Sequence, residues 1–262
     1  MATAHINGVE LYYETAGDGP PLLLLHGLGS STLDWEFQIP DLARSHRVIA
    51  MDVRGHGRSS KPPGPYTVAQ FAKDAVALLE TLHATPADIV GLSMGGMIAF
   101  QMAVDAPASV RSLTIVNSGP AMILQTFGQR MLIQSRFAMI RLFGMRALGK
   151  MVAGPLFPNP DQAHLRERFI THLAENDPRA YRASLRAIVG WSVAERIGQI
   201  RCPVLVVASD HDYTPVALKQ AYVGKIPGAR LRVLNDSRHA APLDQPDQLN
   251  RAVLEFLSEA RS

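Results

Sequence analysis

Apolar runs of strand length recur along the chain and alternate with segments in which apolar residues follow helical spacing. A run that is apolar throughout suits a strand that is buried on both faces. An earlier segment, residues 9–15, alternates polar and apolar positions after an Asn7-Gly8 turn signal, which predicts a hairpin with residues 5–6. The continuous run lies at residues 22–25, and further strands are predicted at residues 47–51, 89–90, 110–117, 203–208 and 229–234.

Three segments show the spacing of amphipathic or buried helices. Residues 97–106 form one of them, and residues 67–82 and 247–260 each carry an apolar stripe. Because strands and helices alternate with short links, we predict a largely parallel sheet covered by helices. The two stripes consist of Val68, Phe71, Ala75, Leu78, Leu79 and Leu82, and of Leu249, Val253, Phe256 and Leu257.

The alternation stops between residues 119 and 192, where the pattern predicts helix throughout. This region is rich in Met, Phe and Arg and is interrupted by a proline cluster at Pro155, Pro158 and Pro160. We therefore predict a helical cap at residues 119–192, inserted into a core made of residues 1–118 and 193–262.

Composition narrows the class of protein. The chain has 262 residues, of which 47% are hydrophobic, so it can bury a large core. Its net charge is +3, but Lys and Arg are scattered, which argues against a nucleic-acid partner. Cys202 is the single cysteine, so an internal disulfide is excluded and a buried thiol is expected.

The chain also lacks the patterns that direct a protein to or through a membrane. Residues 1–15 have neither the charged nor the apolar region of a signal peptide. No run approaches the roughly 18 apolar residues of a membrane span. We therefore expect a soluble cytoplasmic protein without stable membrane insertion, whose oligomeric state the pattern does not predict.

A G-x-S-x-G pentapeptide, Gly91-Leu92-Ser93-Met94-Gly95, lies between an apolar run and a helical segment. A serine on a sharp strand-to-helix turn needs a strained backbone, and the positions two before and two after crowd together and favour glycine. Ser93 is therefore a candidate nucleophile. The pentapeptide alone is a weak signal, so the rest of the chain has to support it.

A nucleophilic serine needs a histidine base and a carboxylate that orients the base, and the chain supplies both in later loops. Asp210 and Asp212 follow the run at 203–208, and His239 follows the run at 229–234. Active residues of open α/β sheets gather at the carboxyl ends of the strands. The order Ser, Asp, His is therefore consistent with one site.

Over nearly its full length the chain resembles an α/β-hydrolase-fold serine hydrolase. His26-Gly27-Leu28-Gly29 is similar to the oxyanion loop after the third strand of that family, and Gly91 to Gly95 is similar to its nucleophile elbow. Asp52-Val53-Arg54-Gly55-His56-Gly57-Arg58-Ser59 resembles the loop after the fourth strand. The resemblance implies an eight-stranded, mostly parallel sheet with flanking helices, and Asp212 rather than Asp210 as the acid beside His239.

The resemblance also implies two backbone N–H donors for the oxyanion. Met94 follows the nucleophile at the start of a helix, whose first amides point toward the site, and Leu28 follows the glycine of the oxyanion loop. A metal or phosphate site is an alternative for His26, Arg54 and His56, but their glycine-rich surroundings favour structural roles. We expect no metal and no organic cofactor.

Several aromatic and basic residues are candidates for the substrate pocket. Trp35 and Trp191 could line it, or could belong to the ordinary core. Residues 130–152 interleave basic residues with Met and Phe, including Phe137, which favours a cap with an apolar inner face and basic residues in solvent. A helix lying on a membrane surface is the alternative. If one arginine of this segment points toward the active-site cleft, a substrate with a negatively charged carboxylate is favoured.

Within the resembling family, carboxylesterases, enol-lactonases and cofactor-free perhydrolases are the closest matches. We expect hydrolysis of small to medium esters or lactones through an acyl-enzyme. The alternatives on the same triad are enol-lactone hydrolysis, perhydrolysis and carbon-carbon bond hydrolysis, the last disfavoured because Ala240 follows His239 where a tryptophan is frequent. A non-catalytic ligand receptor is the alternative from another class.

Overall fold

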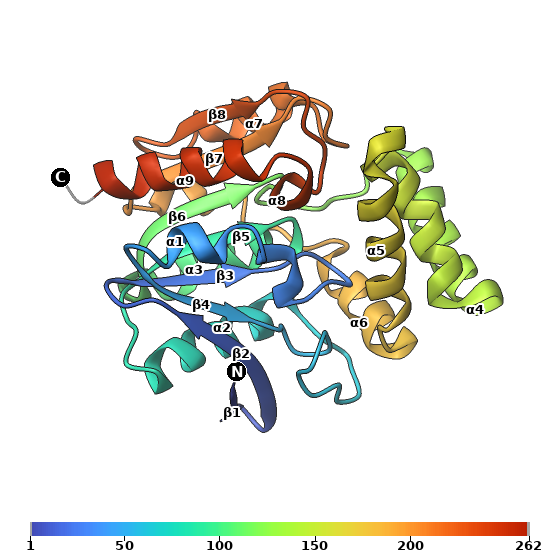
Figure 1. Cartoon of the computed structure of the whole chain (residues 1–262), viewed down its shortest axis with the longest axis horizontal. Helices are drawn as coiled ribbons and strands as arrows, with labels where there is room; N and C mark the ends of the chain where they lie inside the picture. The colour runs from blue at the N-terminus through green and yellow to red at the C-terminus, as the bar shows by residue number, and fades with distance from the viewer. Residues whose placement is uncertain (1, 261–262) are drawn as a thin grey trace.

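The computed structural model describes residues 2–260, and its centre is a single eight-stranded sheet (Figure 1). The strand order is β1-β2-β4-β3-β5-β6-β7-β8; β2 pairs antiparallel with β1 and β4, and all other pairs are parallel. The predicted eight-stranded, mostly parallel sheet is thus confirmed. The strands are β1 (Ala2–Ile6), β2 (Val9–Ala16), β3 (Pro21–Leu25), β4 (Arg47–Met51), β5 (Ala87–Leu92), β6 (Val110–Val116), β7 (Val204–Ser209) and β8 (Arg230–Leu234).

Helices cover both faces of the sheet, which explains why the central strand β3 is apolar on both of its faces. Successive side chains of a strand point to opposite faces. Leu23 and Leu25 belong to the apolar cluster that includes α2 (Val68–Thr81) and α3 (Met94–Asp105), whereas Leu22 and Leu24 belong to the cluster that includes α9. The remaining core helices are α1 (Ile39–Leu42), α7 (Val216–Val223), α8 (Ala241–Asp244) and α9 (Pro246–Glu259).

Between β6 and β7 the chain forms α4 (Phe127–Leu156), α5 (Ala163–Ala174) and α6 (Pro178–Ile188). Figure 1 shows these three helices together, on the side toward which the carboxyl ends of the parallel strands point. Helix therefore dominates this region, but residues 119–126 contain no helix and include a bridge between Ala121 and Ser192. The exact division into core and cap stays a prediction.

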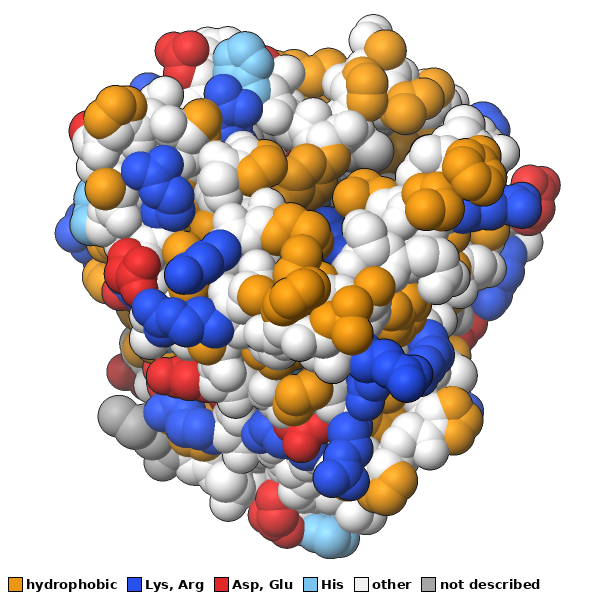
Figure 2. All heavy atoms as spheres, turned by 90° about the vertical axis from the view of Figure 1, so that its right-hand side faces the viewer, with side chains coloured by type: hydrophobic (Ala, Val, Ile, Leu, Met, Phe, Trp, Pro, Cys, Tyr) orange, Lys and Arg blue, Asp and Glu red, His pale blue; other side chains and the backbone are white. Residues whose placement is uncertain are grey.

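The outer surface of α4 is unusually apolar. The helix consists of two parts, because Gly144, at φ +77°, interrupts it. Figure 2 shows the face of the molecule that carries both parts of α4, where hydrophobic side chains gather beside basic ones. Among residues 2–260, no helix is long and apolar enough to cross a membrane. The exposed side chains of α4 include Phe127, Met131, Leu132, Leu142 and Phe143.

Candidate active site

Ser93 occupies a strained turn between β5 and α3. Its backbone has φ +53° and ψ −114°, and φ in this region is rare for a residue with a side chain. A Cβ on Gly91 would overlap the Gly95 carbonyl, and a Cβ on Gly95 would overlap the Leu25 carbonyl. Both glycines of the pentapeptide are therefore required by close backbone approach. The turn holds the half-buried Ser93 side chain at the edge where the parallel strands end.

The loop after β6 connects the Ser93 turn to the loop that carries His239. The Ser93 N–H donates to the Val116 carbonyl at 3.0 Å, and the Ser118 hydroxyl donates to the Ser93 carbonyl at 2.6 Å. Asn117, at φ +46°, donates its side-chain N–H to the His239 carbonyl at 3.1 Å. These bonds fix the two loops relative to each other. Neither Asn117 nor Ser118 was among the functional residues predicted from the sequence.

His239 and Asp212 lie side by side at the same edge of the sheet. The His239 Nδ1 is 2.6 Å from the Asp212 Oδ1, so Nδ1 carries the proton and Nε2 is left as the acceptor. The Tyr213 ring stacks on the His239 ring with centroids 4.4 Å apart. The imidazole is thus held by a hydrogen bond at one edge and by an aromatic face.

The second oxygen of Asp212 is bound by a buried lysine. The Lys219 Nζ is 2.5 Å from the Asp212 Oδ2 and also donates to the Thr214 carbonyl at 2.7 Å. Lys219 is only 1% exposed. Burial would raise the pKa of Asp212, but hydrogen bonds and charges from His239 and Lys219 outweigh it and lower the pKa below its ordinary value. The carboxylate therefore stays ionised at neutral pH.

Lys219 was not predicted from the sequence as part of the site, although a signal was present. The lysine stands alone in the segment Val216–Val223, which is otherwise mostly apolar, seven residues after Asp212. A single charge inside an apolar segment that follows two acids suggests a buried ion pair.

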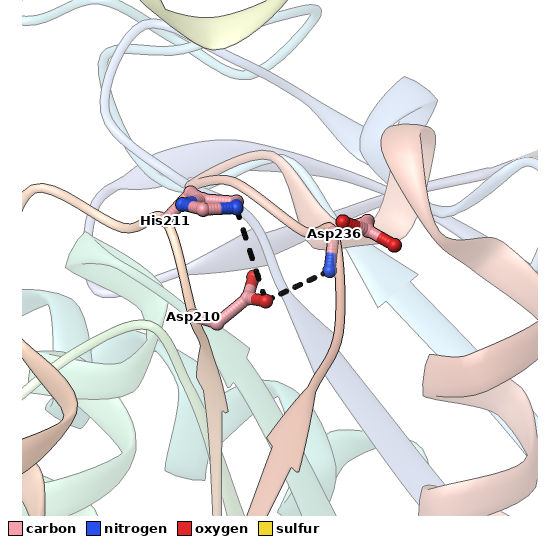
Figure 3. Close-up of side chains that lie close together, drawn as sticks. All are labelled: Asp210, His211 and Asp236. Carbon is pink, nitrogen blue, oxygen red and sulfur yellow. Dashed lines mark hydrogen bonds and ion pairs between the residues drawn. The ribbon is translucent and has the colours of Figure 1, made fainter.

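Asp210, the alternative acid, has a different position. Its carboxylate accepts the N–H groups of Asp236 and Ser237, each at 2.9 Å, and thereby ties the loop after β7 to the loop after β8. Figure 3 shows Asp210, His211 and Asp236 at this surface, with the Asp236 carboxylate turned away from Asp210. These three residues could offer metal ligands, but they are exposed, and Asp210 already serves the loop connection.

The predicted oxyanion loop lies directly beside the Ser93 turn. A Cβ added to Gly27 would lie 3.7 Å from the Ser93 Cβ. Gly29, at φ +76°, lies against Leu173 and Tyr181, so the loop also contacts the cap helices. The structure thus brings the backbone around Leu28 and Met94 to the same place as Ser93.

Asp34 supports this loop from behind. It follows β3 in the short 3-10 helix Thr32–Trp35, and its carboxylate accepts the Gly27 N–H at 3.3 Å and the Ser30 hydroxyl. Burial raises the pKa of Asp34 to about 6, although both hydrogen bonds and the charges of Arg168 and His239 act in the opposite direction. The carboxyl group therefore holds its proton more tightly in the folded protein than in the unfolded chain.

This raised pKa predicts a specific dependence of stability on pH. Between pH 4 and 6 the folded protein binds more protons than the unfolded chain, so the contribution of Asp34 is fully present below pH 4 and is lost as the pH rises through 6. In Asp34→Asn this loss disappears. We expect the Tm difference between wild type and variant to change by about 3–6 °C from pH 4 to pH 7, in favour of the variant at the higher pH. Calorimetry at both pH values checks this, and a constant difference would contradict it.

His26, Arg54 and His56 are used for structure, as their surroundings predict. The Val53 N–H donates to the His26 Nε2 at 2.9 Å, and burial lowers the pKa of His26 to about 4 and that of His56 to about 3. Arg54 binds both oxygens of Asp74 at 2.7 and 2.8 Å. The two imidazoles are therefore neutral at physiological pH, and the arginine is already paired.

Of the three predicted pocket residues, Trp35 lies in the core, and the pocket roles of Trp191 and Phe137 stay predictions. Trp35 has no exposed surface and packs in the cluster of Leu22 and Leu24, so it belongs to the core. The Trp191 indole N–H donates to the Gln101 side chain at 2.7 Å. Gln101 follows Ser93 by eight residues, so its backbone lies roughly 12 Å from Ser93 along the axis of α3. Phe137 is partly buried on the inner side of the cap, with the Arg186 guanidinium 5.1 Å from its ring centre.

Comparison with known proteins gives a consistent result. A family model described as the alpha/beta hydrolase fold matches residues 20–246. The chain is 32% identical to a putative carbamate hydrolase RutD of Azorhizobium caulinodans, with 99% of both chains covered. It is 31% identical to a 3-oxoadipate enol-lactonase 2 of Acinetobacter baylyi, over 94% of this chain and 92% of that one. The crystal structure of an enol-lactonase from Burkholderia xenovorans superposes with a TM-score of 0.91 at 27% identity, covering 98% of this chain and 100% of that one.

Proposed function

The chain belongs to the α/β-hydrolase fold family and is a hydrolytic enzyme, and from this premise we propose that it cleaves carboxylic esters or lactones through an acyl-enzyme on Ser93. One observation carries the proposal. The His239 Nδ1 donates to the buried Asp212 carboxylate, at the sheet edge where the strained Ser93 turn is linked to the His239 loop through Asn117 and Ser118.

The roles follow from the chemistry of these groups. The Ser93 hydroxyl attacks the carbonyl carbon, and the His239 Nε2 takes the hydroxyl proton. Asp212 holds the imidazole in the tautomer with the proton on Nδ1 and stabilises the imidazolium. His239 then returns the proton to the leaving alcohol as the carbon-oxygen bond breaks. A water molecule, activated in the same way, hydrolyses the acyl-enzyme and releases the acid and Ser93.

The negative oxygen of each tetrahedral intermediate needs preorganised donors. We assign this role to the backbone N–H groups of Met94 and Leu28. The Met94 amide begins α3, where the helix dipole favours negative charge, and the Leu28 amide belongs to the loop braced by Asp34. Such donors typically contribute about a hundredfold or more in rate each.

An enol-lactone is the second candidate substrate. It is favoured by the likeness to two enol-lactonases, one by sequence and one by structure. A lactone places acyl and alcohol parts in one ring, but its carbonyl reacts through the same steps. Perhydrolysis uses hydrogen peroxide in place of water on the same acyl-enzyme, so turnover of one acetate ester in water and in peroxide separates the two reactions.

A substrate panel tests the proposal. We expect purified protein to hydrolyse p-nitrophenyl esters of two to eight carbons, with kcat/KM highest for short or medium acyl groups, and to open small lactones measured by pH-stat. A carbamate series is included because of the likeness to putative carbamate hydrolases. Turnover of carbamates with no hydrolysis of any ester or lactone would overturn the ester proposal. A background response to all three series would favour a ligand receptor.

A further inference from the structure

Arg136 interrupts the apolar inner stripe of α4. The stripe consists of Ile133, Phe137 and Ile140, which follow one another at helical spacing, and both isoleucines are buried. Arg136 lies three residues after Ile133 and four before Ile140, and so on the same face of the helix. The side chain of Arg136 is itself partly buried. The expectation that the basic residues of this segment face solvent is therefore wrong for Arg136. It holds for Arg130, Arg141, Arg146 and Lys150, which are exposed.

The guanidinium of Arg136 lacks a full set of partners. Its Nε is buried without a hydrogen-bond partner among the described residues. Among residues 2–260, no ion pair between Arg136 and a carboxylate is found, and two acids of this half of the molecule pair with other cations, Glu167 with Arg146 and Glu36 with Arg168. A buried donor without a partner costs free energy, and a bound anionic ligand is one way in which such a group gains its partner.

The neighbours of Arg136 locate it over the proposed catalytic residues. The Arg136 side chain makes a hydrogen bond with the Tyr181 phenol, and its charge also acts on the Tyr213 phenol. Tyr213 stacks on His239, and Tyr181 contacts Gly29 of the oxyanion loop. Arg136 is thus flanked by one residue next to the base and one next to the oxyanion loop.

We propose that Arg136 binds a carboxylate group carried by the substrate, a few bonds from the scissile carbonyl. The proposal rests on the function proposed above and narrows its substrate class to anionic esters or lactones. A planar guanidinium can bind a carboxylate through two parallel hydrogen bonds, which are strong in a site with little water. Figure 2 shows a hollow between hydrophobic side chains on the cap face, with basic atoms visible inside it.

Matched pairs of substrates test the proposal by kinetics. Monomethyl glutarate and methyl pentanoate differ by a carboxylate on the acyl side, and 3-acetoxypropanoate and propyl acetate differ by one on the alcohol side. We expect wild type to prefer the anion in at least one pair. Arg136→Met should lower kcat/KM for that anion by about 10- to 100-fold and change the neutral partner by less than about threefold. Arg141→Met, on the exposed side of the same helix, is the matched control and should change neither.

A binding measurement separates failure of this inference from failure of the proposed function. In Ser93→Ala protein, calorimetry should detect glutarate and not the neutral glutaramide, and Arg136→Gln should abolish the glutarate signal. Glutarate binding that depends on Arg136, without ester turnover, would keep the subsite and overturn the esterase. Turnover of neutral esters with neither anion preference nor glutarate binding would overturn the subsite and keep the esterase. The first glutarate measurement uses Ser93→Ala protein, in which Arg136 is intact. Poor folding of an Arg136 variant therefore cannot explain an absence of glutarate binding there.

Discussion

Replacing Ser93 with alanine should lower kcat for the best ester by about 10⁵-fold, since the remaining groups can only orient water and stabilise charge. KM should change little, because the hydroxyl contributes to bond formation and not to binding. Folding should survive, because the hydrogen bonds at this turn use the Ser93 backbone and alanine keeps the backbone atoms. Steady-state kinetics on purified protein, with circular dichroism as a check on folding, measures both expectations.

Covalent labelling makes the Ser93 result specific. A fluorophosphonate probe followed by intact mass should add one group to wild type and none to Ser93→Ala. Ser258→Ala, in the terminal helix α9, should label like wild type. An adduct that persists in Ser93→Ala would identify another nucleophile and contradict the assignment. Substituting the Met94 or Leu28 side chain by alanine is not an equivalent test, since it leaves the backbone N–H groups that we propose as oxyanion donors.

The positions of the main elements were predictable because they depend on local pattern. A strand covered by helices on both faces is mostly apolar, and Leu22 to Leu25 show this by dividing their side chains between the two clusters. Ser93, Asp212 and His239 follow the parallel strands β5, β7 and β8, and parallel strands bring their carboxyl ends to one edge. The approximate location of the candidate site thus follows from topology.

The orientation of individual side chains was not predictable in the same way. Trp35 is near the oxyanion loop in sequence, but the 3-10 helix Thr32–Trp35 turns its ring into the core while directing Asp34 toward Gly27. Arg136 and Arg141 look alike in the sequence, and only the packing of α4 decides which one is partly buried. Contacts between residues far apart in the chain carry no local signal.

Asp212→Asn should have two large effects, because the carboxylate serves both His239 and Lys219. Loss of the charge that orients the imidazole should lower kcat by about 10⁴-fold. The same change leaves the Lys219 ammonium buried without an opposite charge, which typically costs about 3–5 kcal/mol in the free energy of unfolding. The pKa of Asp212 is lowered in the fold, so its stabilisation is present above its ordinary pKa of 3.8 and is lost as the pH falls below that value. The stability gap between wild type and variant should therefore shrink in acid.

A second substitution distinguishes the two effects of Asp212. Lys219→Met replaces the buried ammonium by an apolar group of similar length, so the Asp212→Asn/Lys219→Met double variant contains no uncompensated charge. Stability should return toward that of wild type, because a buried ion pair can be exchanged for well-packed apolar groups at little cost. The 10⁴-fold loss in kcat should remain, since His239 still lacks its carboxylate. If activity returned together with stability, Asp212 would be a structural partner of Lys219, and the acid beside His239 would have to be sought elsewhere. Urea unfolding and ester hydrolysis on the three variants and wild type decide between these outcomes.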